Sequence, residues 1–344
     1  MKAVICREFG PIDKLEVGTL PSPDLEDHQV RVAVETASVN FMDLLMVQGG
    51  YQMKPPIPFV PGTDAAGEIV EVGALVRNLK VGQRVMCMDF FGAYSNEWAL
   101  SEAKVHPLPD SVNYVQAAAH IGAYGTAYYA LVERAGLKRG ETLVVHGASG
   151  GLGLAAVEVG RVLGARVLGS VGSDGKKSIV REYGADDVFN YSTESVRDLM
   201  KGLNGGKGAD VVFDVVGGSV FEQSLRGMNW GGRIMPVGFT SGQIPVIPAN
   251  LPLLKGFSVV GVFYGAAFSI EPLLIRRMRE TLLSWLAEGK IRPHIHQVLP
   301  LEEAVAGMKL LADRKATGKV VLAMKPQADS AYFSRVPENP RRRS

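Results

Sequence analysis

A glycine-rich stretch in the middle of the chain, from Thr142 to Gly153, reads TLVVHGASGGLG. Its apolar run Leu143–Val145 has the pattern of a buried strand, and a helix pattern follows over Leu152–Leu163. Glycines between a strand and a helix let the backbone approach a pyrophosphate, which the free N–H groups at the helix start then bind. The same pattern is compatible with a simple tight turn, so its context decides between the two.

The context is an alternation of strands and helices. Further strands are expected over Arg166–Val171, Asp187–Asn190, Ala209–Asp214, Gly232–Gly238 and Phe257–Val262, with a helix over Gly175–Tyr183. This alternation predicts a parallel, doubly wound α/β sheet, with ligands beyond the carboxyl ends of its strands. Gly172, Gly217, Gly238 and Phe263 stand at or just past such ends, so this part of the chain is predicted to bind a dinucleotide.

The end of the second strand bears on which dinucleotide is bound. An NAD site places an acid there to accept from the ribose 2′-OH. Here Gly172 and Ser173 follow the strand, Asp174 comes slightly late, and Lys176 and Lys177 come next. A lysine and a serine hydroxyl can both bind a 2′-phosphate, which favours NADPH over NADH. Asp174 leaves NADH open, and the two lysines are also compatible with a solvated helix start.

Charge and composition exclude several other classes. The 344 residues are enough for two domains of about 150 residues each. The formal charge is +2, and the tail Gln327–Ser344 carries the same excess, four arginines against Asp329 and Glu338. The neutral body has no basic footprint for nucleic acid. The polar tail lacks an apolar period and is expected to be disordered, while Arg341–Arg343 leave a membrane or partner signal open.

The two cysteines, Cys6 and Cys87, are too few for a disulfide framework and fit a reducing compartment. The start of the chain lacks the long apolar stretch of a secretory signal. No run approaches the roughly 18–20 apolar residues of a membrane helix. We therefore expect a cytoplasmic protein that has no membrane partner.

Two further regions flank the dinucleotide unit. Residues 1–122 contain alternating apolar runs such as Gln29–Val34 and Gly67–Val72, typical of a barrel-like sheet. From Ala266 onward we expect helix Pro272–Leu286, strand His296–Leu299, helix Leu301–Arg314 and strand Lys319–Ala323. The last strand is too short to form a domain, so the chain is expected to return to the first domain.

Several stretches match a known family in order along the chain. They are Ser38–Asp43, Gly49–Tyr51, Pro61–Gly67, Val81–Val85, Val145–Gly153 and Ala316–Val320. With them, the chain from Met1 to about Lys325 resembles the zinc-free quinone oxidoreductases, the zeta-crystallin type, of the medium-chain dehydrogenase/reductase superfamily. The C-terminal third, including Gly289–His294 and Pro300–Glu303, is similar to the quinone oxidoreductase-like branch.

The resemblance implies an α/β fold of two domains. A GroES-like, β-rich catalytic domain would comprise residues 1–122 and 266–326, and a Rossmann domain with a doubly wound parallel sheet would comprise residues 123–265, before the tail 327–344. The family is often a homodimer joined through the last strand of the dinucleotide domain, here Phe257–Val262. An apolar edge strand suits that role, unless its own chain covers it.

The resemblance also implies the residues of the site. The pyrophosphate would contact Ser149, Gly150, Gly151 and Leu152. The adenosine side would use Gly172, Ser173, Lys176, Tyr191 and Arg314, with Gly238 and Phe263 also near the cofactor. Asn40, Tyr51 and Thr126 would line the nicotinamide and substrate side.

The zinc-binding members of the superfamily hold their catalytic metal with cysteine, histidine and glutamate ligands. The matching positions here are Asn40, Thr63, Asp64 and about Ala123, and the cysteines of the structural zinc lobe are missing. A catalytic zinc needs three such ligands, so no metal is expected. Without a Lewis acid the favoured reaction is hydride transfer from NADPH to an activated acceptor, such as a quinone or an enone.

Three functions stay open at this point: an NADPH-dependent quinone reductase, an enoyl or alkenal reductase, and an NADPH-binding protein with little turnover. In the second, Tyr51 would donate the proton; it can equally well only stack on a ring. His146 is interpreted as a packed residue, because it precedes the glycine turn and no partner ligand is evident.

Overall fold

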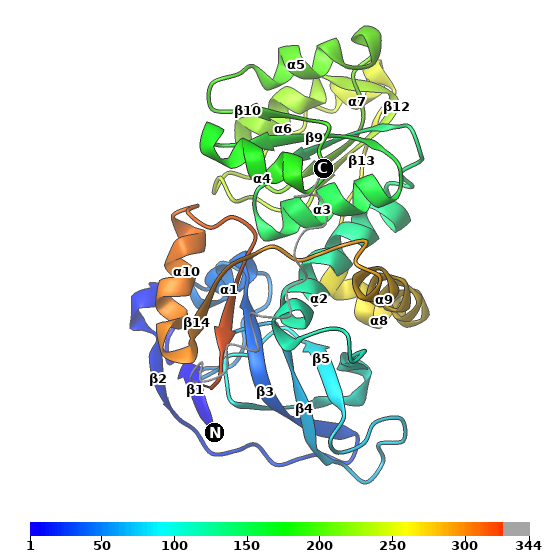
Figure 1. Cartoon of the computed structure of the whole chain (residues 1–344). Helices are drawn as coiled ribbons and strands as arrows, with labels where there is room; N and C mark the ends of the chain where they lie inside the picture. Colours follow the sequence, from blue (N-terminus) through cyan, green and yellow to red (C-terminus); the bar gives the residue numbers. More distant parts are fainter. Residues whose placement is uncertain (326–344) are drawn as a thin grey trace. The chain divides into compact units, whose positions relative to one another are not determined.

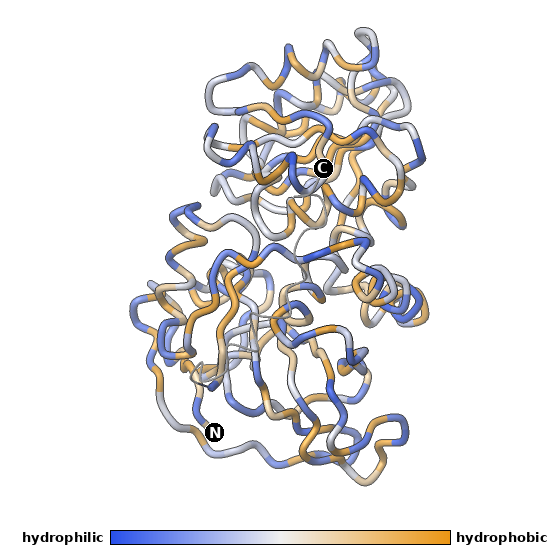
Figure 2. The backbone as a smooth tube through the Cα atoms, in the orientation of Figure 1, coloured by the Kyte–Doolittle hydropathy of each residue, from blue (hydrophilic) through white to orange (hydrophobic). Residues whose placement is uncertain are grey.

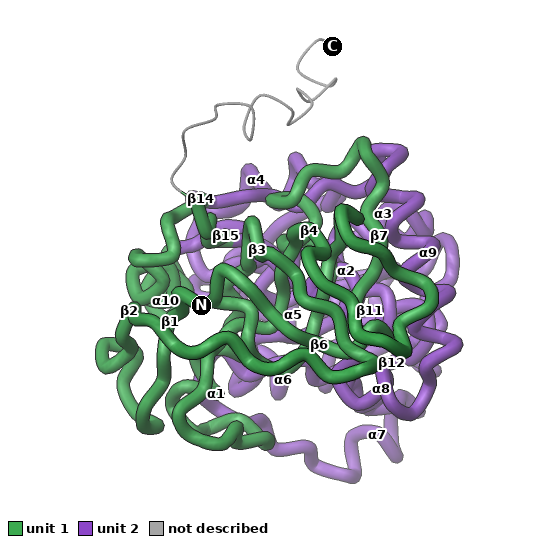
Figure 3. Tube along the Cα trace, turned by 90° about the horizontal axis from the view of Figure 1, so that it is seen from below, with its two compact units in different colours: residues 1–121, 297–315, 320–344 green, residues 122–296, 316–319 purple. Residues whose placement is uncertain are grey.

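The computed structural model describes residues 1–325, and the expected disordered tail lies outside the described residues. The chain divides into two compact units, coloured separately in Figure 3. Unit 1 comprises Met1–Ile121, Gln297–Lys315 and the chain from Val320 onward. Unit 2 comprises Gly122–His296 and Ala316–Lys319.

Unit 2 is built on a parallel sheet whose described strands have the order β10-β9-β8-β11-β12-β13 (Figure 1). The strands are β8 (Thr142–His146), β9 (Arg166–Val171), β10 (Asp187–Asn190), β11 (Ala209–Asp214), β12 (Met228–Pro236) and β13 (Ser258–Val259). Chain order runs outward from β8 in both directions, so the order reverses between β8 and β11, and ligands of such sheets bind at the carboxyl ends of the strands at this point. The predicted doubly wound sheet is confirmed.

Helices cover both faces of this sheet. They are α3 (Gly151–Val162), α4 (Lys177–Glu182), α5 (Val196–Gly202), α6 (Gly218–Leu225) and α7 (Asn250–Lys255). Unit 2 also contains the C-terminal part of α2 (Tyr114–Tyr128) with its π-helical extension (Tyr129–Arg134), α8 (Tyr264–Ile270) and α9 (Pro272–Ala287). Short 3-10 helices occur at η4 (Asp174–Lys176) and η5 (Leu203–Gly206). Within residues 1–325, no helix is both long and apolar enough to cross a membrane.

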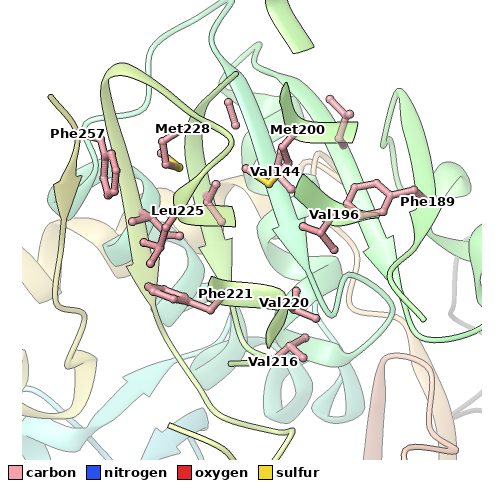
Figure 4. Packing of buried hydrophobic residues seen from close by; sticks show 14 residues of the cluster. Val144, Phe189, Val196, Met200, Val216, Val220, Phe221, Leu225, Met228 and Phe257 are labelled. Carbon is pink, nitrogen blue, oxygen red and sulfur yellow. The ribbon is translucent and has the colours of Figure 1, made fainter. Parts of the chain in front are cut away.

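The strands are apolar on both sides because both sides are covered. Val144 belongs to a buried cluster with residues of α5 and α6, such as Met200 and Phe221, which Figure 4 shows from close by. Its neighbour Leu143 faces α3, where a Cβ on Gly160 would lie 2.5 Å from Leu143 Cδ2. The hydropathy colouring of Figure 2 shows this continuous apolar character along the sheet. Because side chains on both faces of each strand are buried, neighbouring strands pair in a defined register. This register aligns the carboxyl ends of the parallel strands.

Residues 266–296 lie in unit 2, whereas the sequence analysis assigned them to the first domain. Side-chain contacts from α2 and its π-helical extension explain why these residues belong to unit 2. The rings of Tyr128 and Trp285 lie 5.6 Å apart, and the hydroxyl of Tyr129 donates to Glu271 at 2.9 Å. These contacts attach α8 and α9 to the dinucleotide-binding unit.

Unit 1 contains a mainly antiparallel sheet of order β14-β15-β3-β4-β5-β7, with β6 also on β3, and a separate β1–β2 pair. Its strands are β1 (Lys2–Ile5), β2 (Glu16–Thr19), β3 (Gln29–Val39), β4 (Asp64–Val72), β5 (Arg84–Met88), β6 (Glu97–Ser101), β7 (Val105–Pro107), β14 (Ile295–Pro300) and β15 (Lys319–Ala323). Its helices are η1 (Ile12–Lys14), α1 (Phe41–Val47), η2 (Glu102–Lys104), the first part of α2, η6 (Leu301–Glu303) and α10 (Ala304–Ala312).

The end of the described chain returns to this sheet. β15 pairs antiparallel with β3, and Val320 is the register partner of Val39. The expected return of the chain to the first domain is therefore confirmed. The same return carries Ala316–Lys319 into unit 2, where it contacts the glycine turn.

Candidate functional site

The glycine turn connects the central strand β8 to α3, as the sequence predicts. Gly147 has a φ of 71°, a left-handed conformation that favours glycine. A Cβ on Gly153 would lie 2.2 Å from the carbonyl oxygen of Gly147, so α3 can approach the turn only because Gly153 has no side chain. A Cβ on Gly151 would lie 2.3 Å from Lys319 Cδ. At both positions a side chain would collide with the chain's own atoms, so glycine is what lets α3 and Lys319 pack this closely against the turn.

A second segment braces this turn. The N–H of Gly318 donates to the carbonyl oxygen of Ser149 at 2.8 Å, and Gly150 and Gly318 form an isolated β-bridge. The N–H of Lys319 in turn donates to the carbonyl oxygen of His294 at 2.8 Å. In the sequence, Ala316–Val320 stood out only as a matching stretch. Its contact with the glycine turn forms only in the tertiary fold, so no local sequence pattern predicts this contact.

The turn fits a pyrophosphate. The first N–H groups of a helix have no partner within the helix, and they concentrate positive potential at its start. Gly151 begins α3 at the carboxyl end of β8, and Ser149, Gly150 and Leu152 surround this position. The structure thus brings together the four residues that the sequence analysis assigned to the pyrophosphate.

Four of the residues assigned to the adenosine side, Gly172, Ser173, Lys176 and Tyr191, lie just after β9 and β10. Asn190 is the register partner of Val171, and the N–H of Tyr191 donates to the carbonyl oxygen of Val171 at 3.0 Å. A Cβ on Gly172 would lie 2.8 Å from the hydroxyl oxygen of Tyr191, so these two residues are in contact. Ser173 immediately precedes η4, and Lys176 is its last residue.

The two lysines of this region differ in their surroundings. Lys177 Nζ lies 2.9 Å from Asp174 Oδ1 and 3.0 Å from Glu194 Oε1. Hydrogen bonds to both carboxylates raise the pKa of Lys177, and its ammonium lowers the pKa of Asp174. Lys176 is half-buried at the end of η4. From the sequence alone the two lysines look alike, because the partner that distinguishes Lys177, Glu194, is far away along the chain.

Three further residues lie at other places in unit 2. Gly238 follows β12, and its N–H approaches the carbonyl oxygen of Asp214 at 3.3 Å. Phe263 directly precedes α8, with 52% of its surface exposed. Thr126 lies on α2 and donates its hydroxyl to the carbonyl oxygen of Gly122 at 2.8 Å. Gly238, Phe263 and Thr126 thus lie on or next to three different elements of unit 2.

Asp214 was missed as a site residue. It ends β11, is fully buried, and its carboxylate accepts from the N–H groups of Val216 and Gly217 at 2.8 and 3.0 Å. Burial raises the pKa of Asp214 to about 6, and the two N–H donors oppose this shift. The carboxylate therefore holds the loop after β11 in a conformation that leads into α6.

In unit 1, Asn40 lies in a polar cluster at the start of α1. Its Nδ2 donates to Thr63 Oγ1 at 2.8 Å and to Asp64 Oδ2 at 2.9 Å, while its N–H donates to Asp43 Oδ2 at 2.8 Å. The hydroxyl of Tyr94 also donates to Asp43 Oδ2, at 2.7 Å. Thr63, Asp64, Asp43 and Tyr94 are buried. The two hydrogen bonds from Nδ2 thus fix the orientation of the Asn40 amide.

Tyr94 belongs to this cluster but carries no sequence signal. Burial and the carboxylate of Asp43 raise the pKa of Tyr94 well above its usual value, so the phenol keeps its proton and acts as a donor. A Cβ on Gly62 would lie 2.2 Å from Tyr94 Cδ1, so the ring sits against the backbone before β4.

Tyr51 follows α1 and is half-buried, and burial raises the pKa of its phenol. Arg314 follows α10 with a φ of 56°, an uncommon conformation for a residue other than glycine. Asn40, Tyr51 and Arg314 belong to unit 1, whereas the predicted phosphate-binding residues belong to unit 2.

Two histidines, His120 and His146, occupy buried, packed positions. His146 is buried between two serine hydroxyls, with Nδ1 2.6 Å from Ser170 Oγ and Nε2 2.8 Å from Ser224 Oγ. Burial lowers the pKa of His146 to about 3 and that of His120 likewise to about 3, so both imidazoles are neutral at physiological pH. Across residues 1–325, no three His, Cys, Asp or Glu side chains gather in a group that could hold a metal ion.

Comparison with known families agrees with this architecture. The alcohol dehydrogenase GroES-like domain family matches residues 26–110, and the zinc-binding dehydrogenase family matches residues 151–288. The quinone oxidoreductase-like protein 2 homolog of Nematostella vectensis is 40% identical over 327 residues, covering 94% of this chain and 89% of that protein. The human quinone oxidoreductase is 33% identical over 327 residues, covering 94% and 98%.

A solved structure leads to the same group. Escherichia coli quinone oxidoreductase in complex with NADPH superposes with a TM-score of 0.88 at 28% identity, over 94% of this chain and 100% of that one. The chain therefore belongs to the medium-chain dehydrogenase/reductase superfamily. Within it, the chain is an oxidoreductase of the quinone oxidoreductase type.

Proposed function

We propose that the protein is an NADPH-dependent quinone reductase that works by direct hydride transfer without a metal ion. The observation that carries the proposal is the glycine turn at the carboxyl end of β8, where α3 begins at Gly151. The first N–H groups of α3 have no partner within the helix and can bind a pyrophosphate there, in a chain of the quinone oxidoreductase type.

Residues on two strand ends would hold the cofactor. Ser149, Gly150, Gly151 and Leu152 bind the pyrophosphate, and Gly172, Ser173 and Tyr191 enclose the adenosine side. Lys176 provides the charge-assisted hydrogen bond to the 2′-phosphate. When bound, NADPH supplies the hydride that reduces the acceptor. A relative of the same type, the E. coli quinone oxidoreductase, forms a complex with NADPH, which supports this choice of cofactor.

The polar cluster around Asn40 supports a reaction without metal. Asn40, Thr63 and Asp64 stand where zinc-binding relatives have metal ligands, and Asn40 Nδ2 donates to both Thr63 Oγ1 and Asp64 Oδ2. An amide, a hydroxyl and one carboxylate are a poor donor set for zinc, which prefers thiolate and imidazole. Reduction of an acceptor that is already electrophilic needs no Lewis acid. For a quinone, water can protonate the resulting hydroquinone anion, so no side chain has to supply that proton.

A kinetic comparison tests this proposal. The purified protein is incubated with NADPH and a panel of ortho-quinones, para-quinones, enals and enoyl thioesters, and NADPH oxidation is followed by absorbance. We expect saturation kinetics with a quinone and no loss of rate after treatment with a metal chelator. NADPH oxidation that depends on added zinc, or no turnover with any quinone, would contradict the proposal.

Tyr51 favours a second candidate, a reductase of α,β-unsaturated carbonyl compounds. Its phenol is half-buried with a raised pKa, so it retains the proton that such a substrate needs at its α-carbon. A well-placed acid contributes about 10²–10⁴-fold to the rate. Tyr51→Phe should then lower kcat for an enal by about that factor while leaving NADPH affinity and quinone turnover unchanged. Equal enal turnover in both proteins would remove Tyr51 from this role.

The assembly and the location of the protein belong to the same proposal. We propose a homodimer formed along β13, because this strand stands at the edge of the sheet in unit 2. We also propose a cytoplasmic location, since Cys6 and Cys87 are both free thiols buried in unit 1.

A further inference from the structure

Four side chains at the ends of β9 and β10 form a small network that we call the Lys177 clamp: Asp174, Lys177, Asn190 and Glu194. Lys177 Nζ bridges Asp174 Oδ1 at 2.9 Å and Glu194 Oε1 at 3.0 Å. Asn190 Nδ2 lies 3.4 Å from the same oxygen of Asp174. The N–H of Asn190 donates to Glu194 Oε1 at 2.7 Å. The clamp therefore ties the segment after β9 to the segment after β10.

The clamp holds an acid that stands slightly after, but close to, the position that the opposite cofactor preference would require. Asp174 follows the glycine turn by roughly the 20 residues typical of the acid that accepts from a ribose 2′-OH. A carboxylate there would favour NADH and repel the 2′-phosphate of NADPH. Asp174 is 71% exposed, so neither burial nor a second helix hides its charge.

Lys177 cancels that charge instead. Its side chain is only 23% exposed, and its ammonium lies within 3.0 Å of both carboxylates. To reach a phosphate directly, Lys177 would have to give up two ion pairs. The lowered pKa of Asp174 and the raised pKa of Lys177 agree with a pair that stays fully ionised. Lys177 is thus an internal counter-ion, a role different from that proposed for Lys176.

We propose that Lys177 determines cofactor specificity by neutralising Asp174, so that the chain keeps its preference for NADPH although an acid follows β9. The inference rests on the proposed NADPH site at Ser173 and Lys176. It adds that the preference for NADPH depends on the ion pair between Lys177 and Asp174. Removal of Lys177 alone should release the Asp174 carboxylate to accept from the 2′-OH of NADH.

The test is a double-mutant cycle on nucleotide binding alone. Dissociation constants of NADPH and NADH are measured by fluorescence titration for the parent, Lys177→Met, Asp174→Asn and the double variant. Lys177→Met should lower the NADPH-over-NADH preference about three- to tenfold, as expected for a released surface charge facing a phosphate. The double variant should return to within about 1.5-fold of the parent, clearly above Lys177→Met. Lys177→Arg is the matched control and should keep the parental preference.

The other outcomes of the double-mutant cycle contradict either the role of Lys177 or the proposed cofactor. If the double variant is as poor as Lys177→Met, Lys177 acts on the nucleotide directly and the inference is wrong. An unchanged preference in Lys177→Met overturns it as well. Melting curves of all variants check that the fold is intact. A parent protein that binds neither nucleotide, or that prefers NADH, contradicts the proposed cofactor itself, and this is read from the parent alone.

Discussion

Lys176 stands at the end of η4, two residues after Asp174, and it is the residue on which the proposed phosphate preference depends most directly. Lys176→Ala removes one charge-assisted hydrogen bond, which contributes about 1.5–3 kcal/mol. We expect NADPH to bind about 10–100-fold more weakly and NADH almost unchanged. Fluorescence titration of both nucleotides measures the two effects.

Lys207→Ala is the matched control for that variant. Lys207 is exposed after η5, so its removal changes the net charge equally without touching the ends of β9 and β10. It should leave both affinities unchanged. Equal losses of NADPH and NADH in Lys176→Ala would mean that Lys176 supports the fold of the pocket and does not bind the phosphate.

Single residues were predictable from the sequence where a local pattern fixes their place. Ser149 and Gly151 were found because glycines mark the step from a strand to a helix, and Gly172 because it follows a buried strand. Tyr94 and Glu194 were not found. Tyr94 meets Asp43 across 51 positions and Lys177 meets Glu194 across 17, and such contacts depend on which strands pair.

At the level of elements, α3 contains a charged residue in an otherwise apolar interior. Glu158 is 2% exposed, accepts from the hydroxyl of Tyr124, and accepts from the N–H of Arg292 at 3.0 Å. Burial raises the pKa of Glu158 to about 7, although both donors oppose the shift. The helix that begins at the glycine turn is therefore joined to α2 and to the segment after α9 by a titratable group.

This carboxyl group makes stability depend on pH. Its pKa is raised in the folded protein, so its contribution to stability is complete below the unfolded value of about 4.5 and is lost as the pH rises through about 7. Glu158→Gln keeps an acceptor for Tyr124 and removes the ionisation. Between pH 5 and pH 8 the variant should gain on the order of 2 kcal/mol of unfolding free energy relative to the parent.

Urea unfolding at the two pH values measures the difference. Glu158→Ala serves as the comparison, since it leaves the hydroxyl of Tyr124 and the N–H of Arg292 without their acceptor and should be less stable at both pH values. Parallel stability curves for the parent and Glu158→Gln would show that Glu158 ionises at an ordinary pKa, and the burial argument would be wrong.

The sequence predicted the elements of the parallel sheet better than those around it. β9, β10, β11 and β15 have the expected bounds, because each is an apolar run between turn residues. The edge strand β13 is shorter than the expected Phe257–Val262, covering only Ser258–Val259, because it has a partner on one side alone. Helix α2 was missed, since Tyr114–Tyr128 is apolar around its whole circumference and has no amphipathic period.

For the molecule as a whole, the edge of the sheet in unit 2 is the place where a second copy is proposed to bind. Trp230, Leu253 and Leu254 are 78%, 80% and 69% exposed. They belong to one region, because a Cβ on Gly256, directly after α7, would lie 2.8 Å from the ring of Trp230. Large apolar side chains with this exposure beside an unpaired strand edge indicate an association surface.

The charged double variant Leu253→Glu/Leu254→Glu tests this surface. A stable dimer buries about 800 Å² on each partner, and its centre tolerates unpaired charges poorly. We expect the parent to sediment as a dimer and the double variant as a folded monomer in analytical ultracentrifugation. Leu273→Glu is the control, since Leu273 is equally exposed at 76% but lies on α9, and it should leave the dimer intact. A monomeric parent, or a double variant that stays dimeric, would contradict an interface at β13 and α7. The backbone gives the physical reason to expect this site: among the described residues 1–325, β13 pairs with β12 alone, and a second copy would satisfy the N–H and C=O groups on its other side.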